Sequence, residues 1–196
     1  MHHRSPPALS AVIAVLAACF VVSSSALAAD QYKADPAHSS VTFRSKHMDT
    51  SYVFGRFDKF EGSVTYDESD PTKFAVQSTV QVDSIDTGQA KRDAHLKSPD
   101  FFSAREFPTI TFKSTSAKSA GEGKYEVTGD LTLHGQTKPI TVTLEKVGSS
   151  TKMGQRVGWI STFTIKRSDY GMSFMLGGDG VGDEIDLTVA FETVKG

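Results

Sequence analysis

Alternation of apolar and polar residues, repeated in eight segments after residue 30, constrains this chain more than any other feature. In the segment 38–47, Val41 and Phe43 fall on one side, whereas Thr42 and Arg44 fall on the other. A period of two residues is typical of a β-strand with one buried and one solvent-facing side. The expected strands lie in the segments 38–47, 60–66, 74–82, 110–112, 125–133, 140–144, 157–165 and 185–191.

Short polar connections join most of these strands, and this spacing predicts an antiparallel sheet that closes on itself. The expected fold is therefore all-β, an eight-stranded antiparallel barrel whose interior can hold one small ligand. The connection between the third and fourth strands is the exception. It combines a predicted short helix over Gln89–Lys97 with an irregular stretch that ends at Pro108.

The first 28 residues have the pattern of a secretory signal peptide. Arg4 supplies the positive charge, Ala8–Val22 is an apolar run, and Ala26-Leu27-Ala28 forms a small-residue cleavage site. Residues 29–196 then suit a single domain, with the periplasm as the expected destination. An alternative is lipidation of Cys19, because Leu16–Cys19 resembles a bacterial lipobox, but cleavage after Ala28 is the favoured interpretation.

Composition and motifs restrict the chemistry of residues 29–196. Cys19 is the only cysteine, so these residues have no thiol nucleophile, disulfide or thiolate metal site. A net charge of −2 gives no reason to expect nucleic acid as a partner. The chain contains neither a Gly-x-Ser-x-Gly nucleophile motif nor a His-Glu-x-x-His zinc motif. We therefore expect no catalytic residue, no metal and no cofactor.

Large aromatic residues occupy the predicted inward positions of several strands. They are expected to line a ligand pocket, and they are Phe43, Phe60, Phe74, Phe112, Trp159 and Phe163. The same rings could instead fill the barrel as a packed core. A cavity is favoured because small residues share the inward phase and would leave gaps among the rings. These small residues are Ser45, Gly62, Ser78, Gly129 and Ser161.

Two segments outside the strands carry further candidates. Arg92 and His95 lie three residues apart and share a helix face, where they could contact an anionic head group. A structural role at the barrel rim is the favoured alternative for this pair. The glycine-rich segment 167–183 contains Met172, Phe174 and Met175, and it forms either a packed plug or a lid over an opening.

Several motifs, in order along residues 35–183, resemble the YceI-like family of bacterial periplasmic proteins. They begin with Asp35-Pro36-Ala37-His38-Ser39 and Gly55-Arg56-Phe57-Asp58, and continue with Arg92-Asp93-Ala94-His95-Leu96. The set is completed by Ser98-Pro99-Asp100-Phe101-Phe102, Phe107-Pro108-Thr109-Ile110-Thr111-Phe112, Gly129–Gly135 and Val181-Gly182-Asp183. The resemblance implies a lipocalin-like barrel whose apolar pore holds a polyisoprenoid chain, such as an isoprenoid quinone or a prenyl phosphate. It also implies export, with no established catalysis.

The sequence therefore predicts a non-enzymatic periplasmic protein that binds, carries or sequesters a long isoprenoid lipid. Two alternatives stay open at this point. One is a stress-response protein whose barrel is filled by side chains. The other is an enzyme for an isoprenoid-type substrate, with His38, His47 or His95 as acid or base. Transient membrane contact and a homodimer are both compatible with the sequence.

Overall fold

The computed structural model describes residues 1–2, 29–177 and 179–196. The predicted signal peptide, including Cys19, therefore lies outside the described residues except for its first two. The strands are β1 (Asp30–Ala34), β2 (Ser40–His47), β3 (Ser51–Phe57), β4 (Phe60–Tyr66), β5 (Ala75–Gln81), β6 (Ile85–Asp86), β7 (Thr109–Ser119), β8 (Lys124–Leu133), β9 (Gln136–Ser150), β10 (Arg156–Lys166) and β11 (Val181–Lys195). The helices are α1 (Ala90–Leu96) and the short 3-10 turns η1 (Pro71–Lys73), η2 (Val82–Ser84) and η3 (Arg167–Tyr170).

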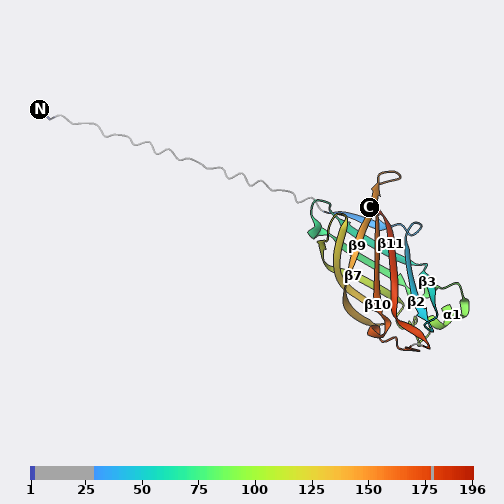
Figure 1. The fold of residues 1–196 in the computed structure, drawn as a ribbon. Coiled ribbons are helices and arrows are strands. Elements are labelled where there is room, and N and C mark those ends of the chain that lie inside the picture. The colour runs from blue at the N-terminus through green and yellow to red at the C-terminus, as the bar shows by residue number, and fades with distance from the viewer. Residues whose placement is uncertain (3–28, 178) are drawn as a thin grey trace.

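These strands form a closed antiparallel barrel of eight long strands, as predicted (Figure 1). Some of the long strands bend, and each bend divides one into two shorter elements. Thus β1 and β2 are two pieces of one long strand, and both pair with β11. Residues 193–195 of β11 pair with β1, and residues 181–190 of β11 pair with β2. In the same way β3 continues into β4, and β5 continues through η2 into β6. The β1–β11 pairing closes the ring.

Strand β3 was not predicted, and its composition explains why. Its outward positions carry Tyr52 and Phe54, which are 48% and 65% exposed. Its inward end carries Phe57, which is buried. Because large apolar residues stand on both faces, the alternation of apolar and polar residues that marks the other strands is missing here.

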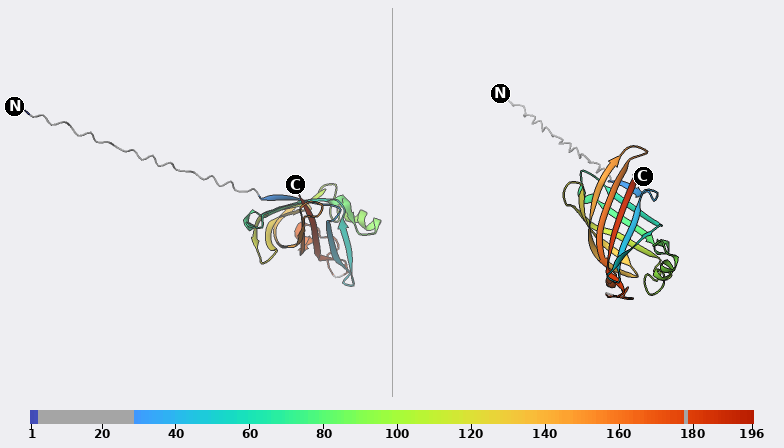
Figure 2. Two further views of the ribbon diagram at one scale, coloured as in Figure 1. Left: turned by 90° about the horizontal axis from the view of Figure 1, so that it is seen from above. Right: turned by 45° about the vertical axis from the view of Figure 1, so that its right-hand side comes forward.

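Helix α1 lies where the sequence predicted it, outside the barrel wall (Figure 2). Its N-cap is Gln89, whose side-chain oxygen accepts a hydrogen bond of 2.7 Å from the backbone N–H of Arg92. No helix among the described residues has the length and apolar character that crossing a membrane requires.

Aromatic and aliphatic side chains close the two ends of the barrel. At one end, Phe74 stacks on Tyr125 with ring centroids 4.4 Å apart, and Tyr66 meets Trp159 edge-on at 5.1 Å. At the other end, the buried side chains of Leu133, Tyr170 and Met172 pack together with partly buried Phe102. The interior between the two ends is therefore apolar.

Candidate ligand cavity

An apolar cavity of about 100 Å³ lies inside the barrel. Its wall comes from strands all around the ring. The polar residues in the wall are Ser78, Thr111 and Ser161. The apolar ones are Val41, Phe57, Val76, Val80, Ile110, Phe112, Val127, Leu131, Ile140, Val142, Leu144, Trp159, Phe163, Leu187, Val189 and Phe191.

Three of the six aromatic residues predicted to line the pocket stand in this wall, namely Phe112, Trp159 and Phe163. The other three pack beside the cavity. Phe43 lies against Phe57 at 5.6 Å, Phe60 stacks on Phe191 at 5.8 Å, and Phe74 belongs to the aromatic cluster at the barrel end.

Two aromatic residues of the wall, Phe57 and Phe191, were absent from the predicted pocket lining. Phe191 has the inward phase of β11, and this signal could have identified it. Phe57 belongs to β3, a strand that the sequence did not reveal.

Four of the five small inward residues divide into two groups, and the fifth, Ser45, does not line the cavity. Ser78 and Ser161 line the cavity, as the gap argument expected. Gly62 and Gly129 instead make room for aromatic rings. A Cβ on Gly62 would meet Phe191 at 2.7 Å, and a Cβ on Gly129 would meet Phe112 at 2.5 Å. Part of the predicted free space is therefore occupied by the rings of neighbouring strands.

Trp159 contributes a polar atom to this apolar region. Its side chain is 1% exposed, and the indole N–H has no hydrogen-bond partner among the described residues. An unpaired buried donor costs on the order of 1–3 kcal/mol relative to a paired one. The cavity wall thus includes one residue with unused hydrogen-bonding capacity.

Arg92 and His95 do not line the cavity. The guanidinium of Arg92 donates from Nε to the Thr87 hydroxyl at 2.7 Å and from Nη2 to the Thr87 carbonyl at 2.8 Å. His95 Nε2 lies 2.8 Å from Asp100 Oδ2, and its ring meets Phe101 and Phe174 edge-on. Both side chains hold the segment between β6 and β7 in place.

The glycine-rich segment that follows β10 combines a packed root with an exposed tip. Met172 is buried, whereas Phe174, Met175 and Leu176 are exposed. Arg167, itself 3% exposed, holds the two ends of this segment together. It donates to the carbonyls of Met172, Val181 and Gly182 at 2.8–3.0 Å. Burial lowers the pKa of Arg167, although Asp183 opposes this effect.

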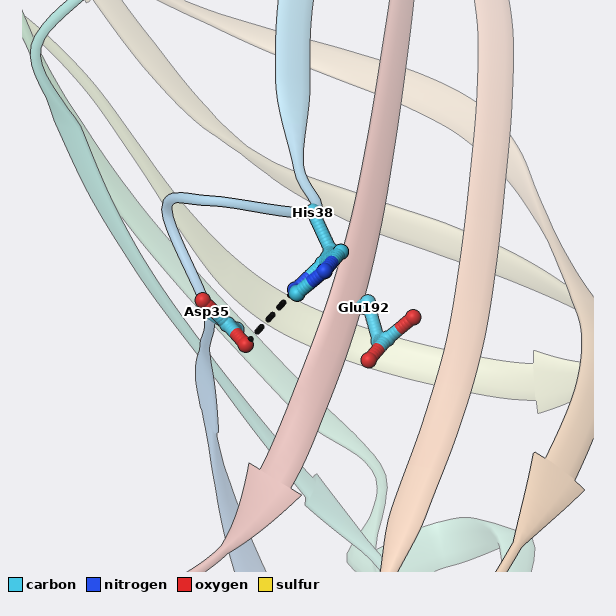
Figure 3. Close-up of side chains that lie close together, drawn as sticks. All are labelled: Asp35, His38 and Glu192. Atoms are coloured by element: carbon cyan, nitrogen blue, oxygen red, sulfur yellow. Dashed lines mark hydrogen bonds and ion pairs between the residues drawn. The ribbon is translucent and has the colours of Figure 1, made fainter. Parts of the chain in front are cut away.

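A polar cluster lies on the outer face where β1, β10 and β11 meet (Figure 3). Asp35 Oδ2 lies 3.0 Å from His38 Nδ1, and Arg156 Nη1 contacts both Asp35 and Glu192. Hydrogen bonds from His38, Arg156 and the backbone of Ala37 lower the pKa of Asp35 to about 2. The carboxylates and His38 are close enough to share a metal ion, but the Arg156 guanidinium already occupies both carboxylates.

The histidines of the enzyme hypothesis lie outside the cavity. His47 has the apolar phase of β2 in the sequence, yet it is exposed at the end of that strand. His38 is also exposed, and it lies in the turn between β1 and β2. His95 is also exposed, with a relative side-chain accessibility of 47%. No histidine among the described residues faces the apolar interior.

Comparison with known proteins agrees with this architecture. UPF0312 proteins of Vibrio cholerae and Pseudomonas aeruginosa are 39% and 38% identical over 161 and 174 residues, covering 81% and 87% of this chain and 83% and 89% of theirs. The crystal structure of Burkholderia cenocepacia BcnA superposes with a TM-score of 0.74 at 28% identity, covering 81% of this chain and 98% of that one.

A polyisoprenoid-binding domain from Saccharophagus degradans shares the fold, with a TM-score of 0.66 at 15% identity, over 86% of this chain and 99% of that domain. The YceI-like domain profile matches residues 32–193, from the first strand of the barrel to the last. The chain belongs to the YceI-like family.

Proposed function

We propose that this protein binds an isoprenoid lipid, such as an isoprenoid quinone or a prenyl phosphate, inside its barrel, and so carries or sequesters it. The observation that carries the proposal is the cavity wall, in which three side chains are polar and the rest are hydrocarbon or aromatic. Such a wall favours a ligand without charge along most of its length. The name of the Saccharophagus degradans domain, polyisoprenoid-binding, supports the same ligand class.

Binding rather than catalysis fits the placement of the polar groups. The titratable clusters described above, around Asp35, His95 and Arg167, lie outside the cavity. A general acid or base must reach the reacting atoms within hydrogen-bond distance. Affinity would come from burial of the chain at about 25 cal/mol per Å², before the costs of association are subtracted.

The size of the cavity sets a condition on this function. An engineered cavity of about 150 Å³ holds one benzene molecule, and ligand pockets commonly reach about 300–1,000 Å³. A cavity of about 100 Å³ is therefore smaller than a long isoprenoid requires. If the protein binds such a lipid, the barrel wall must move apart and the cavity must enlarge when the ligand enters. If the wall does not move, the barrel is a packed structural protein. This small volume is the observation that favours the second candidate function.

Lipid extraction distinguishes these two candidates. Protein purified without detergent from the envelope of a bacterial host is expected to release an isoprenoid on solvent extraction, identified by mass spectrometry. Binding can also be followed through Trp159, the only tryptophan of the chain, which lies in the cavity wall. A short-tailed isoprenoid quinone should quench its fluorescence to saturation. Absence of both lipid and quenching would leave the packed barrel as the explanation.

We also propose that the protein acts in the periplasm after cleavage behind Ala28. Intact mass of the exported protein is then expected to correspond to a chain beginning at Ala29. A mass that includes a diacylglycerol group on Cys19 would instead show a membrane-anchored lipoprotein.

A further inference from the structure

The barrel wall is incomplete between β9 and β10. These strands pair from Arg156 opposite Ser150 to Ile160 opposite Glu145, and the pairing ends there. The remainder of β9, residues 136–144, pairs with β8 on its other side. The remainder of β10, residues 161–166, pairs with β11 on its other side. Two strand edges therefore face each other over several residues without backbone pairing.

Apolar inward side chains along these two edges connect the cavity with the outside of the barrel wall. Ile140 and Val142 of β9, with Phe163 of β10, line the cavity and are only partly buried. Ile165 is also partly buried. Inward residues of the fully paired β8, such as Val127 and Leu131, are buried instead. Cavity-lining residues of β7 and β11, such as Phe112 and Val189, are partly buried as well, so the missing backbone pairing, and not exposure alone, distinguishes these two edges.

Pro139 supports the assignment of β9 as an edge in this region. A proline has no backbone N–H and is found in sheets on edge strands, where no partner needs that donor. Pro139 lies within the unpaired part of β9. The sequence itself therefore fits a strand without a neighbour on that side.

Contacts at both ends limit the length of the opening. At its upper limit, the Ser161 hydroxyl donates to the Thr143 carbonyl at 2.8 Å. At its lower limit, His134 Nδ1 lies 2.9 Å from the carbonyl oxygen of Tyr170. Another interruption of the wall, where β6 pairs only with β3, is filled by aromatic packing, with Phe102 5.8 Å from Phe57.

We propose that the unpaired seam between residues 136–143 and 162–166 is a lateral portal, through which an isoprenoid chain enters and leaves the barrel. This inference rests on the proposed function. It also meets the condition set by the small cavity, because two strands without mutual hydrogen bonds can separate at lower cost than a paired wall. The aromatic cluster at one barrel end and the packing of Leu133, Tyr170 and Met172 at the other would then remain intact during exchange.

A reversible cross-link across the seam tests the portal. Continuing the register below Ile160 and Glu145 would place Thr164 opposite Thr141, and both residues are exposed. The variant Thr141→Cys/Thr164→Cys, in a Cys19→Ala background, is joined with a short bis-methanethiosulfonate reagent. The matched control is Thr128→Cys/Thr141→Cys, which joins β9 to its paired neighbour β8 at the same height. The readout is the rate of Trp159 quenching by a short-tailed isoprenoid quinone.

A portal predicts at least tenfold slower association and dissociation in the β9–β10 cross-linked protein, with the dissociation constant little changed. Reductant should restore both rates, and the β8–β9 control should match the wild type. A second variant, His134→Ala, removes the lower contact and should accelerate entry severalfold. Rates that stay within twofold of the control in both tests overturn the portal while the proposed function stands. If the wild type shows no quenching at all, the proposed function fails first.

Discussion

The ring of Phe191 in β11 rests against the backbone of Gly62 in β4, and β1 lies between these two strands in the sheet. A Cβ at residue 62 would lie 2.7 Å from Cε2 of that ring. Phe191 also stacks on Phe60 and forms part of the cavity wall. The absence of a side chain at one position of β4 therefore fixes how far a ring from β11 reaches into the barrel.

Gly62→Ala is expected to destabilise the protein by about 1–3 kcal/mol, because the added methyl group must push the Phe191 ring aside. Phe191→Leu in the same chain should recover part of this loss. The matched control is Gly158→Ala, since a Cβ at this strand position has its nearest neighbour at 3.5 Å. Urea unfolding measures both variants. Equal stability of Gly62→Ala and the control would show that the ring moves freely.

Phe112 and Phe74 offer a comparison between a cavity wall and a packed core. Phe112 is partly buried and lines the cavity, whereas Phe74 is 4% exposed within the aromatic cluster at the barrel end. Phe74→Ala should cost the roughly 3–5 kcal/mol that is typical of a filled core, and Phe112→Ala should cost less. Phe112→Asp should sharply reduce quinone binding, because it places a carboxylate against an apolar ligand. Equal losses for the two alanine variants would indicate a packed barrel.

The low pKa of Asp35 predicts a defined acid dependence of stability. Its carboxylate has a pKa of about 2 in the folded protein, owing to hydrogen bonds from His38, Arg156 and Ala37, compared with an ordinary value of 3.8. A carboxylate with a depressed folded pKa stabilises the fold above its unfolded pKa, and this contribution disappears as the pH falls through the folded pKa. Stability should therefore decline between about pH 4 and pH 2. Asp35→Asn should reduce the loss of unfolding free energy between pH 4 and pH 2, as measured by urea unfolding across this range. An unchanged pH profile would show that Asp35 is not the source of this acid dependence.

Arg167 should control the order of the glycine-rich segment. Replacing it with Met leaves the carbonyls of Met172, Val181 and Gly182 without their charged donor, and hydrogen bonds of this kind contribute about 1.5–3 kcal/mol each. We expect lower stability and faster proteolysis within residues 173–180. Arg167→Lys is the matched variant: it keeps the charge but lacks the planar fork, so it should rescue only partly. Full rescue by lysine would show that charge alone holds the segment.

Residue phase identified most of the strands and the faces that they bury, but neither β3 nor the height of each residue along the barrel. Phe74 and Phe112 share an inward phase, yet one closes an end while the other lines the cavity. Height depends on strand register, which is set between chain segments far apart in sequence. The same reason hid the break between β9 and β10, since the alternation in Gln136–Ser150 continues beyond the last pair with β10.

The unpaired part of β9 also exposes the protein to association with itself. A free strand edge is a template on which another chain can add a strand, and natural proteins protect such edges with proline and lysine. Lys138 and Pro139 stand side by side on this edge. An opening that admits lipid would thus need protection against intermolecular β-pairing, and replacing Pro139 by valine should make the protein more prone to aggregation.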